Sequence, residues 1–431
     1  MNFNFTRSSF TAFLKKMNIK WESISLSIII KELKLFVVNP FFYIKKYLPF
    51  GVALILFAGL LFSRALLSVG EGAAAIYGAV FIFNTRKQYA YSLLWGFIPS
   101  VLCCLGIYQT AILKAADLDY FLTLAAYPSL LLFFLRLDDV QKKQVVACWI
   151  VAVFISLLYP LAWYVFHFKE TVSRYEHGQT LPVLMNDDHV RYGIFISSGL
   201  IPLLHRSFFR KKTKILLATI IALAIVFLSV RTAWVALFIL LLVYLPGFFK
   251  WQRSVAALFV FAAFVLLAYK MIPTVNQKVN YTIYDWQHYD AQKYLPDFSD
   301  GTRRSVNTVA WQAITHYHKT NIGWNKVPVV LQEVFRQQYP EASLKYGWPF
   351  NQFLFWWMGA GLLGCLLFSL WLFSPALFFF KEKNKAAFGW TLVIAASCMV
   401  ECTLNMQYGV FLHAWAMAYA FSESNKTKSS V

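Results

Sequence analysis

The chain has 431 residues, with 40 Lys and Arg against 20 Asp and Glu and a formal net charge of +20. Hydrophobic residues make up 59% of it, charged residues only 14%, and the mean hydropathy is +0.54. That is about half of the charged share of an ordinary soluble domain, so a large soluble protein is excluded. Apolar runs of roughly 17–25 residues recur along the chain, and each is long enough to cross a bilayer as a helix.

The predicted elements begin with a basic, amphipathic segment, 1–48, in which we expect neither a cleavable signal nor a span. Spans of a polytopic, all-α membrane protein follow. The twelve predicted spans lie at about 49–66, 69–84, 91–108, 118–135, 145–166, 191–204, 214–229, 232–247, 254–272, 352–374, 387–403 and 406–421. The expected domains are the N-terminal segment (1–48), nine spans (49–272), an outer loop (273–350), three spans (351–421) and a tail (422–431).

The distribution of charge predicts the orientation of these spans. If the N-terminus is cytoplasmic, most Lys and Arg residues fall on the cytoplasmic side and most Asp and Glu residues fall on the outer side. Positive charge is enriched in the cytoplasmic loops of membrane proteins, so both termini are predicted to be cytoplasmic. The basic excess then reflects topology and contact with lipid head groups. It is not interpreted as a nucleic-acid footprint, which such a balance would first suggest.

The outer loop, 273–350, is much longer than an ordinary connection, and loops of that length are usually functional or partly folded. Within it, GTRRSVNTVAWQAITHYHKT has apolar residues at helical spacing. PVVLQEVFRQQYPE has a proline near its start, a position that helices tolerate. Two short helices lying on the outer leaflet are predicted there. A second outer segment, 167–190, reads HFKETVSRYEHGQTLPVLMNDDHV.

Four arginines lie on the predicted outer face. Arg191 opens the sixth span, Arg231 stands between two spans with almost no loop, and Arg303 and Arg304 begin the first loop helix. A guanidinium close to hydrocarbon is costly unless it has a partner or faces a wet cavity. Arginine also holds phosphate oxygens through two parallel hydrogen bonds, so these residues suit a pyrophosphate head group. The alternative is local pairing with nearby acids: Asp187, Asp188, Asp300 and Glu401.

Other chemistries find little support. The eight histidines are scattered, and no second cluster accompanies NDDHV, so neither a metal nor a cofactor is expected. The GAGLLG segment at 359–364 lies inside an apolar run, where small residues allow close helix packing. Glu401 lies within a turn of the outer end of the eleventh span, where a carboxylate is either functional or the partner of an arginine.

Together these segments resemble the O-antigen ligase and polymerase family over about residues 50–421. The resemblance rests on DDHVRYGIF, LSVRTAWVALFILL, SDGTRRSVNTVAW followed by TNIGWNKV, YPEASLKYGWPFNQFLFWWMGAGLLG, and VECTLNMQYGVFLHAW. Each motif is weak alone, and their order and spacing carry the similarity. Members of this family take glycans from undecaprenyl pyrophosphate at the periplasmic face of the bacterial inner membrane.

The resemblance implies a metal-independent, inverting glycosyl transferase of the bacterial inner membrane, with the long loop in the periplasm. Its donor would be an undecaprenyl-pyrophosphate-linked glycan, and its acceptor a hydroxyl of another glycan or of lipid A-core. Membrane lipids would surround it, and no nucleic acid would bind. Arginines would hold the pyrophosphate and stabilise its developing charge. The catalytic candidates are Arg231, Arg303, Arg191, Glu401 and His189. The substrate-binding candidates are Arg304, Asp188, Asn351 and Asp300.

One position departs from the family pattern. Where the family has a histidine between the Pro and the Asn that precede the tenth span, this chain has Phe350. In ligases of the family that histidine is thought to help activate the acceptor hydroxyl, and phenylalanine cannot accept a proton. Three alternatives follow. Another base, such as His189, Asp188 or Glu401, replaces the histidine, or a pyrophosphate held by arginines leaves with little help from a base. In the third alternative, activity is changed or lost.

Three other functions remain open. A polymerase of O-antigen or exopolysaccharide would use the same donor. A transporter of lipid-linked sugars would also use outer arginines, but the paired halves typical of many transporters are not seen in the sequence. The third is a degenerate family member without catalysis, which Phe350 suggests.

Overall fold

The computed structural model describes residues 40–80, 90–108, 115–204, 209–248, 251–296, 298–316 and 322–424. Over these residues the chain is helical and contains no strand, which confirms the prediction of an all-α protein. The chain divides into two units, Met1–Gly51 and Val52–Val431, and the second is described below. Most of the predicted N-terminal segment and of the tail lies outside the described residues.

Every predicted span coincides with one helix or with two short consecutive helices. These helices are α3 (Pro40–Phe62), α4 (Arg64–Val80), α5 (Ala90–Tyr108), α6 (Ala115–Leu124), α7 (Ala126–Arg136), α8 (Asp139–Phe166), α10 (His189–Ser198), α11 (Leu200–Leu204), α12 (Lys211–Leu228), α13 (Arg231–Phe248), α14 (Trp251–Met271), α18 (Gln352–Lys381), α19 (Lys385–Val400) and α20 (Gln407–Ser424).

Within the described residues, four stretches are long and apolar enough to cross a membrane: Ala90–Tyr108, Asp117–Arg136, Asp139–Phe166 and Gln352–Lys381. Four shorter apolar helices accompany them, at Lys46–Phe62, Arg231–Tyr244, Ala262–Met271 and Lys385–Val400. The length and apolar composition of these helices therefore identify the chain as a helical membrane protein. The total of twelve spans stays a prediction.

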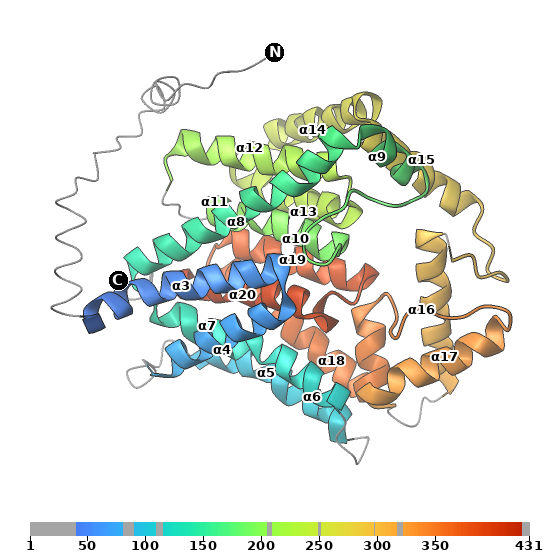
Figure 1. Ribbon diagram of the computed structural model, residues 1–431, viewed down its shortest axis with the longest axis horizontal. Coiled ribbons are helices and arrows are strands. Elements are labelled where there is room, and N and C mark those ends of the chain that lie inside the picture. Colours follow the sequence, from blue (N-terminus) through green and yellow to red (C-terminus); the bar gives the residue numbers. More distant parts are fainter. Residues whose placement is uncertain are drawn as a thin grey trace. The chain divides into compact units, whose positions relative to one another are not determined.

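The core is built around α20, which is buried along nearly its whole length. A helix that is apolar all round must lie inside a bundle, and α20 packs along α7, which also carries α4 (Figure 1). Trp415 of α20 meets the rings of Phe57 and Phe134 edge-on, at 5.0 and 4.7 Å between centroids. α18 packs against α19 and α5, and α13 packs against α19 and α10.

The connections of the predicted outer side contain helices of their own. They are α9 (Phe168–Glu176), α15 (Pro273–Gln287), α16 (Ser299–His316), the 3₁₀ turn η3 (Trp324–Lys326), α17 (Val327–Gln338) and the 3₁₀ turn η4 (Thr403–Asn405). α16 and α17 are the two helices predicted in the long loop, and Pro328 lies in the first turn of α17 as expected. α15 was not predicted. It packs against α9, α14 and α12, and α16 packs against α17 and α18 (Figure 1).

The GAGLLG segment is where α18 bends and receives the long loop. Gly361 has φ 72° and ψ −178°, which interrupts the helix and suits glycine alone. The backbone N–H groups of Ile322 and Gly323 donate to the carbonyls of Met358 and Gly359, both at 3.1 Å. The following side chain, Trp324, then lies against Gly359. Because the residues of this segment are small, the side chain of Trp324 from the long loop can pack against α18.

Candidate functional site

Two adjoining pockets lie among α9, α15, α16 and the N-terminal ends of α10 and α13. The large pocket, about 860 Å³, is lined by the segment 176–179, by α15, by the start of α16 and by the loop before α18. The small pocket, about 410 Å³, is lined by segments 174–180 and 187–190, by the start of α13, and by α15 and α16. The two share four residues: Gly178, Gln179, Ser299 and Arg303.

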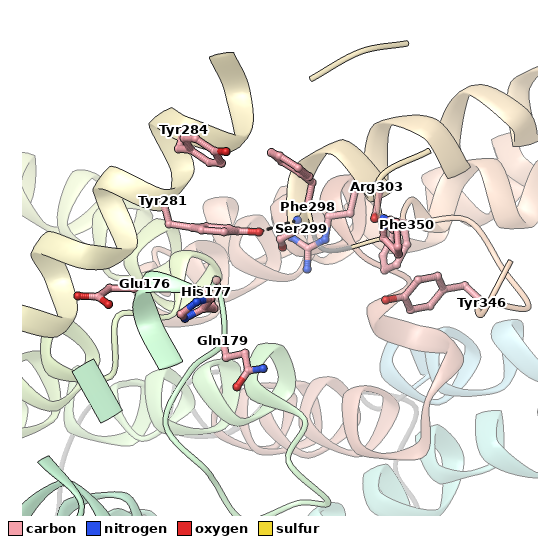
Figure 2. Close-up of a pocket in the computed structure, with 13 residues that line it drawn as sticks. Glu176, His177, Gln179, Tyr281, Tyr284, Phe298, Ser299, Arg303, Tyr346 and Phe350 are labelled. Atoms are coloured by element: carbon pink, nitrogen blue, oxygen red, sulfur yellow. Dashed lines mark hydrogen bonds between the residues drawn. The ribbon is translucent and has the colours of Figure 1, made fainter. Parts of the chain in front are cut away.

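The first turn of α16 is held by side chains of α15. The carboxylate of Asp285 is buried and accepts hydrogen bonds from the backbone N–H groups of Asp300 (2.7 Å) and Gly301 (3.0 Å). The hydroxyl of Tyr281 accepts one from the backbone N–H of Ser299 at 3.2 Å (Figure 2). These contacts satisfy N–H groups that have no partner inside a helix, and a carboxylate complements the helix dipole there. α15 thus fixes the position from which Asp300 and Arg303 extend.

Arg231 is the first residue of α13 and lines the small pocket. Only Ser229 and Val230 separate α12 from α13, and Ser229 takes a left-handed conformation (φ 54°) that ends α12. The guanidinium donates to the carboxylate of Asp300, and its Nη2 lies 3.4 Å from the hydroxyl of Ser299. The ion pair joins α13 to α16 and leaves about a quarter of the Arg231 side chain exposed (27%).

Arg303 lies one turn after Asp300 on α16 and lines both pockets. Its Nη2 donates to Oε2 of Glu401 at 3.3 Å, and its guanidinium carbon lies 5.5 Å from the centroid of the Phe350 ring. The side chain of Arg303 is 25% exposed. Two arginines, each oriented by one carboxylate, therefore meet at the boundary between the pockets.

Lys278 of α15 is a third cation of the small pocket, and it is only 5% exposed. Its ammonium donates to the carbonyl of Gly178 at 2.8 Å. Burial, followed by the neighbouring Arg231 and Arg303, lowers the pKa of Lys278 to about 8, against the opposite effect of Asp300 and Asp285. A buried lysine loses solvation of its charged form, and nearby cations add to that penalty. An anion bound between the three cations would relieve it.

His189, the first residue of α10, also lines the small pocket. Its Nε2 lies 3.8 Å from Oδ1 of Asp187, and its buried Nδ1 has no hydrogen-bond partner among the described residues. Burial lowers the pKa of His189, and Asp187 acts in the opposite direction. Asp187 ends a run of three left-handed residues that begins with Met185, with φ between 54° and 68°. Such backbone is strained for residues other than glycine and clusters at functional sites.

Arg191 lies outside both pockets, and its guanidinium has protein partners on every nitrogen. Nη1 pairs with Asp188 at 2.7 Å, Nη2 donates to the carbonyl of Cys402 at 2.6 Å, and Nε donates to the carbonyl of Thr403 at 3.3 Å. The side chain is buried. Of the two roles that the sequence left open, the structure shows the local ion pair with Asp188. The hydrogen bonds to the carbonyls of Cys402 and Thr403 connect α10 to the η4 turn.

Arg304 and Asn351 also lie outside the two pockets. The guanidinium carbon of Arg304 lies over the rings of Trp286 and Tyr289, 5.1 and 5.3 Å from their centroids. The side chain of Asn351 accepts hydrogen bonds from the backbone N–H groups of Phe353 and Leu354, so it is the N-cap of α18. Its amide also donates to the carbonyl of Met399 at 3.1 Å. The candidates that the structure brings together are thus Arg231, Arg303 and His189, with Asp300 and Glu401 as carboxylate partners.

Residues 216–369 match a family model described as O-Antigen ligase. The chain is similar to O-antigen ligases over this segment. The match runs from α12 into α18, so the matched segment includes the three cations of the small pocket. No curated protein matches the chain. The matched family consists of glycosyltransferase-like enzymes, and this chain has helices long and apolar enough to cross a membrane.

Two residues of the matched segment were not among the candidates from the sequence: Lys278 and Asp285. Both lie on α15, in TVNQKVNYTIYDWQ, where the buried residues Val275, Lys278 and Asp285 fall on one helical face. That spacing was a usable signal. It was overlooked because the buried face carries charge as well as apolar residues, and periodicity searches look for apolar residues only.

Proposed function

We propose that this protein is a membrane glycosyl transferase of the O-antigen ligase type. It moves a glycan from a lipid pyrophosphate carrier to a sugar hydroxyl at the periplasmic face, without a metal and with inversion of the anomeric carbon. The observation that carries the proposal is the convergence of Arg231, Arg303 and Lys278, from three different helices, on one pocket of about 410 Å³.

The chemistry of these cations fits a pyrophosphate diester. Two guanidinium groups and one ammonium offer N–H donors from three directions, and planar guanidinium groups bind phosphate oxygens in pairs. Asp300 and Glu401 orient the arginines before the ligand arrives. Lys278 adds a buried positive charge beside the two arginines, and an anionic ligand would stabilise its charged form.

In the reaction, the glycosidic carbon is attacked and its bond to the pyrophosphate oxygen breaks. Negative charge develops on that oxygen as the bond lengthens. Preformed donors aimed at developing charge are among the strongest contributions to enzymatic rate, and the three cations fill this role. The large pocket, which shares Arg303 with the small one, lies where the sugars flanking the reacting bond would bind.

The remaining candidates take supporting roles in the proposal. His189 lines the pyrophosphate pocket, whereas Arg191 and Asp188 position α10 against the η4 turn. Arg304 and Asn351 shape the neighbouring helices. The lipid carrier requires the bacterial inner membrane, with the 273–350 loop in the periplasm and both termini in the cytoplasm. The donor is an undecaprenyl-pyrophosphate-linked glycan, and the acceptor is a glycan or lipid A-core hydroxyl.

The test is surface polysaccharide in a deletion strain complemented with variants. Arg231→Ala is expected to lower transfer about a hundredfold to a thousandfold, as for the loss of one preorganised donor, with normal protein level in the membrane. Arg231→Lys keeps the charge but not the paired N–H groups and should recover only part of the activity. Arg336→Ala is the matched control, because Arg336 is exposed near the end of α17 and lines neither pocket.

The glycan that accumulates in the deletion strain identifies the reaction. Full-length lipid-linked glycan that is not transferred supports a ligase, and single repeat units support a polymerase of the same family. Normal transfer by Arg231→Ala, or an unchanged polysaccharide profile in the deletion strain, would refute the proposal.

A further inference from the structure

His177 is the histidine among the residues that line the large pocket. It follows the last residue of α9, and its Nδ1 lies 2.8 Å from the backbone carbonyl oxygen of Ser173. A carbonyl oxygen can only accept a hydrogen bond, so Nδ1 must carry the proton. In the neutral ring the lone pair is therefore on Nε2. The fold thus sets the tautomer of an exposed histidine at a pocket wall.

The lining of the large pocket suits a carbohydrate. Tyr284 and Phe298 are stacked at 5.8 Å, and Tyr346 meets Phe350 edge-on at 4.8 Å. In the view of Figure 2, His177 lies on the side of the pocket away from Tyr346 and Phe350. Aromatic faces pack well against the apolar faces of sugars, whereas Phe350 itself supplies no proton acceptor. His177 is placed to supply one.

We propose that His177 is the general base of the reaction and that the large pocket binds the acceptor glycan. This inference rests on the proposed function. The acceptor hydroxyl oxygen forms a bond to the anomeric carbon of the donor, and the bond from that carbon to the pyrophosphate oxygen breaks. The electron pair of the broken bond leaves with the pyrophosphate in the small pocket. The hydroxyl proton passes to Nε2 of His177.

The charged and titratable groups around His177 come from three elements. On its own segment are Arg174 and Glu176, and Lys278 of α15 bonds to the carbonyl of the next residue, Gly178. Arg303 faces the large pocket from α16. The phenol groups that line the pocket belong to Tyr281, Tyr284 and Tyr346.

The experiment uses membranes of the deletion strain, which hold the accumulated lipid-linked glycan and the natural acceptor. Full-length variants are added and transfer is followed with time and pH. His177→Gln keeps a polar side chain but cannot take a proton, and it should lose about a hundredfold or more of the rate. His177→Ala should lose as much and recover at least about tenfold of the rate with added imidazole, which restores a general base.

The matched control is His288→Gln. His288 is exposed, follows the last residue of α15, and has its Nδ1 2.9 Å from the carbonyl of Tyr284, the same arrangement as in His177. It lines neither pocket, so its variant should keep the parent rate. Because both histidines make the same local bond, this control measures the effect of losing the helix-end contact. The ring of His288 also packs on Tyr284, 4.1 Å between centroids, so the control includes any small shift of that pocket wall.

The outcomes separate the inference from the proposed function. If His177→Gln transfers at the parent rate while Arg231→Ala is inactive, the base assignment is wrong and the transferase stands. If the His177 variants are slow but imidazole does not help and the pH profile is unchanged, His177 only positions the pocket and the inference again fails. If Arg231→Ala transfers normally, the proposed function itself fails.

Discussion

Replacing Lys278 by Met separates the electrostatics of the small pocket from its packing. Burial, followed by Arg231 and Arg303, lowers the pKa of Lys278 from 10.5 to about 8. This difference corresponds to about 3 kcal/mol that disfavours the charged lysine in the folded, ligand-free protein. Between pH 8 and 10.5 the unfolded chain binds the proton and the folded protein does not. Stability therefore rises with pH across that window, and the full penalty is present below it.

Lys278→Met keeps the apolar stem and removes the charge, but it leaves the carbonyl of Gly178 without its donor. An unsatisfied buried polar group costs about 1–3 kcal/mol. At pH 7 the variant should therefore be at least as stable as the parent protein. At pH 10 the parent has lost most of its penalty, and the variant should be less stable by about 1–3 kcal/mol.

The assay is thermal unfolding of both purified proteins in detergent at pH 7 and pH 10. A short-chain polyprenyl pyrophosphate-linked sugar, whose charge is constant over this range, is then added. It should stabilise the parent more at pH 7 than at pH 10, and the variant equally at both. A variant that is less stable than the parent by the same margin at both pH values would refute the reasoning, because Lys278 would then act through packing alone.

Three further substitutions test how the site is held. Asp285→Ala leaves two backbone N–H groups of α16 without their acceptor and should lower both the unfolding free energy, by about 1–3 kcal/mol, and polysaccharide transfer. Asn351→Ala should cost about 1 kcal/mol of stability in thermal unfolding and leave transfer within about threefold, whereas a large loss of transfer at normal stability would show substrate contact. Gly359→Ala should cost about 1–3 kcal/mol, because the new methyl group would overlap the Trp324 ring. Its control is Gly72→Ala, where nothing lies within 4 Å, and equal melting of the two variants would contradict the packing argument.

The helical framework was predictable because apolar runs report helices directly. In the polar loop, α16 was predicted from the spacing of residues such as Val306 and Val309, which are buried. α17 was predicted from a segment with Pro328 near its start. An asparagine directly before an apolar run, such as Asn351, is a usual sequence signal for the start of a helix. Division of the chain into nine and three spans around a loop stays a prediction.

The pairing of charges in the site was predictable only in part. Arg191 and Asp188 are three residues apart on one helix, and such pairs meet by geometry. The partners of Arg231 and Arg303 lie 69 and 98 residues away along the chain, so the sequence could nominate the acids but not assign them. Sequence spacing did not predict the environment of Lys278, because its pKa depends on burial in the folded chain and on arginines from two other helices.

The packing of the Trp324 ring limits how the long loop can be exchanged for that of a related protein. The ring is wedged between Gly106 of α5 and Gly359 of α18, and its Nε1 donates to the carbonyl of Cys103 at 2.8 Å. A Cβ at either glycine would collide with the ring. A chimera that imports another loop to change glycan preference must therefore carry the tryptophan and both glycines together. If only the loop between the membrane-spanning helices were exchanged, the contact of Trp324 with Gly106 and Gly359 would be lost.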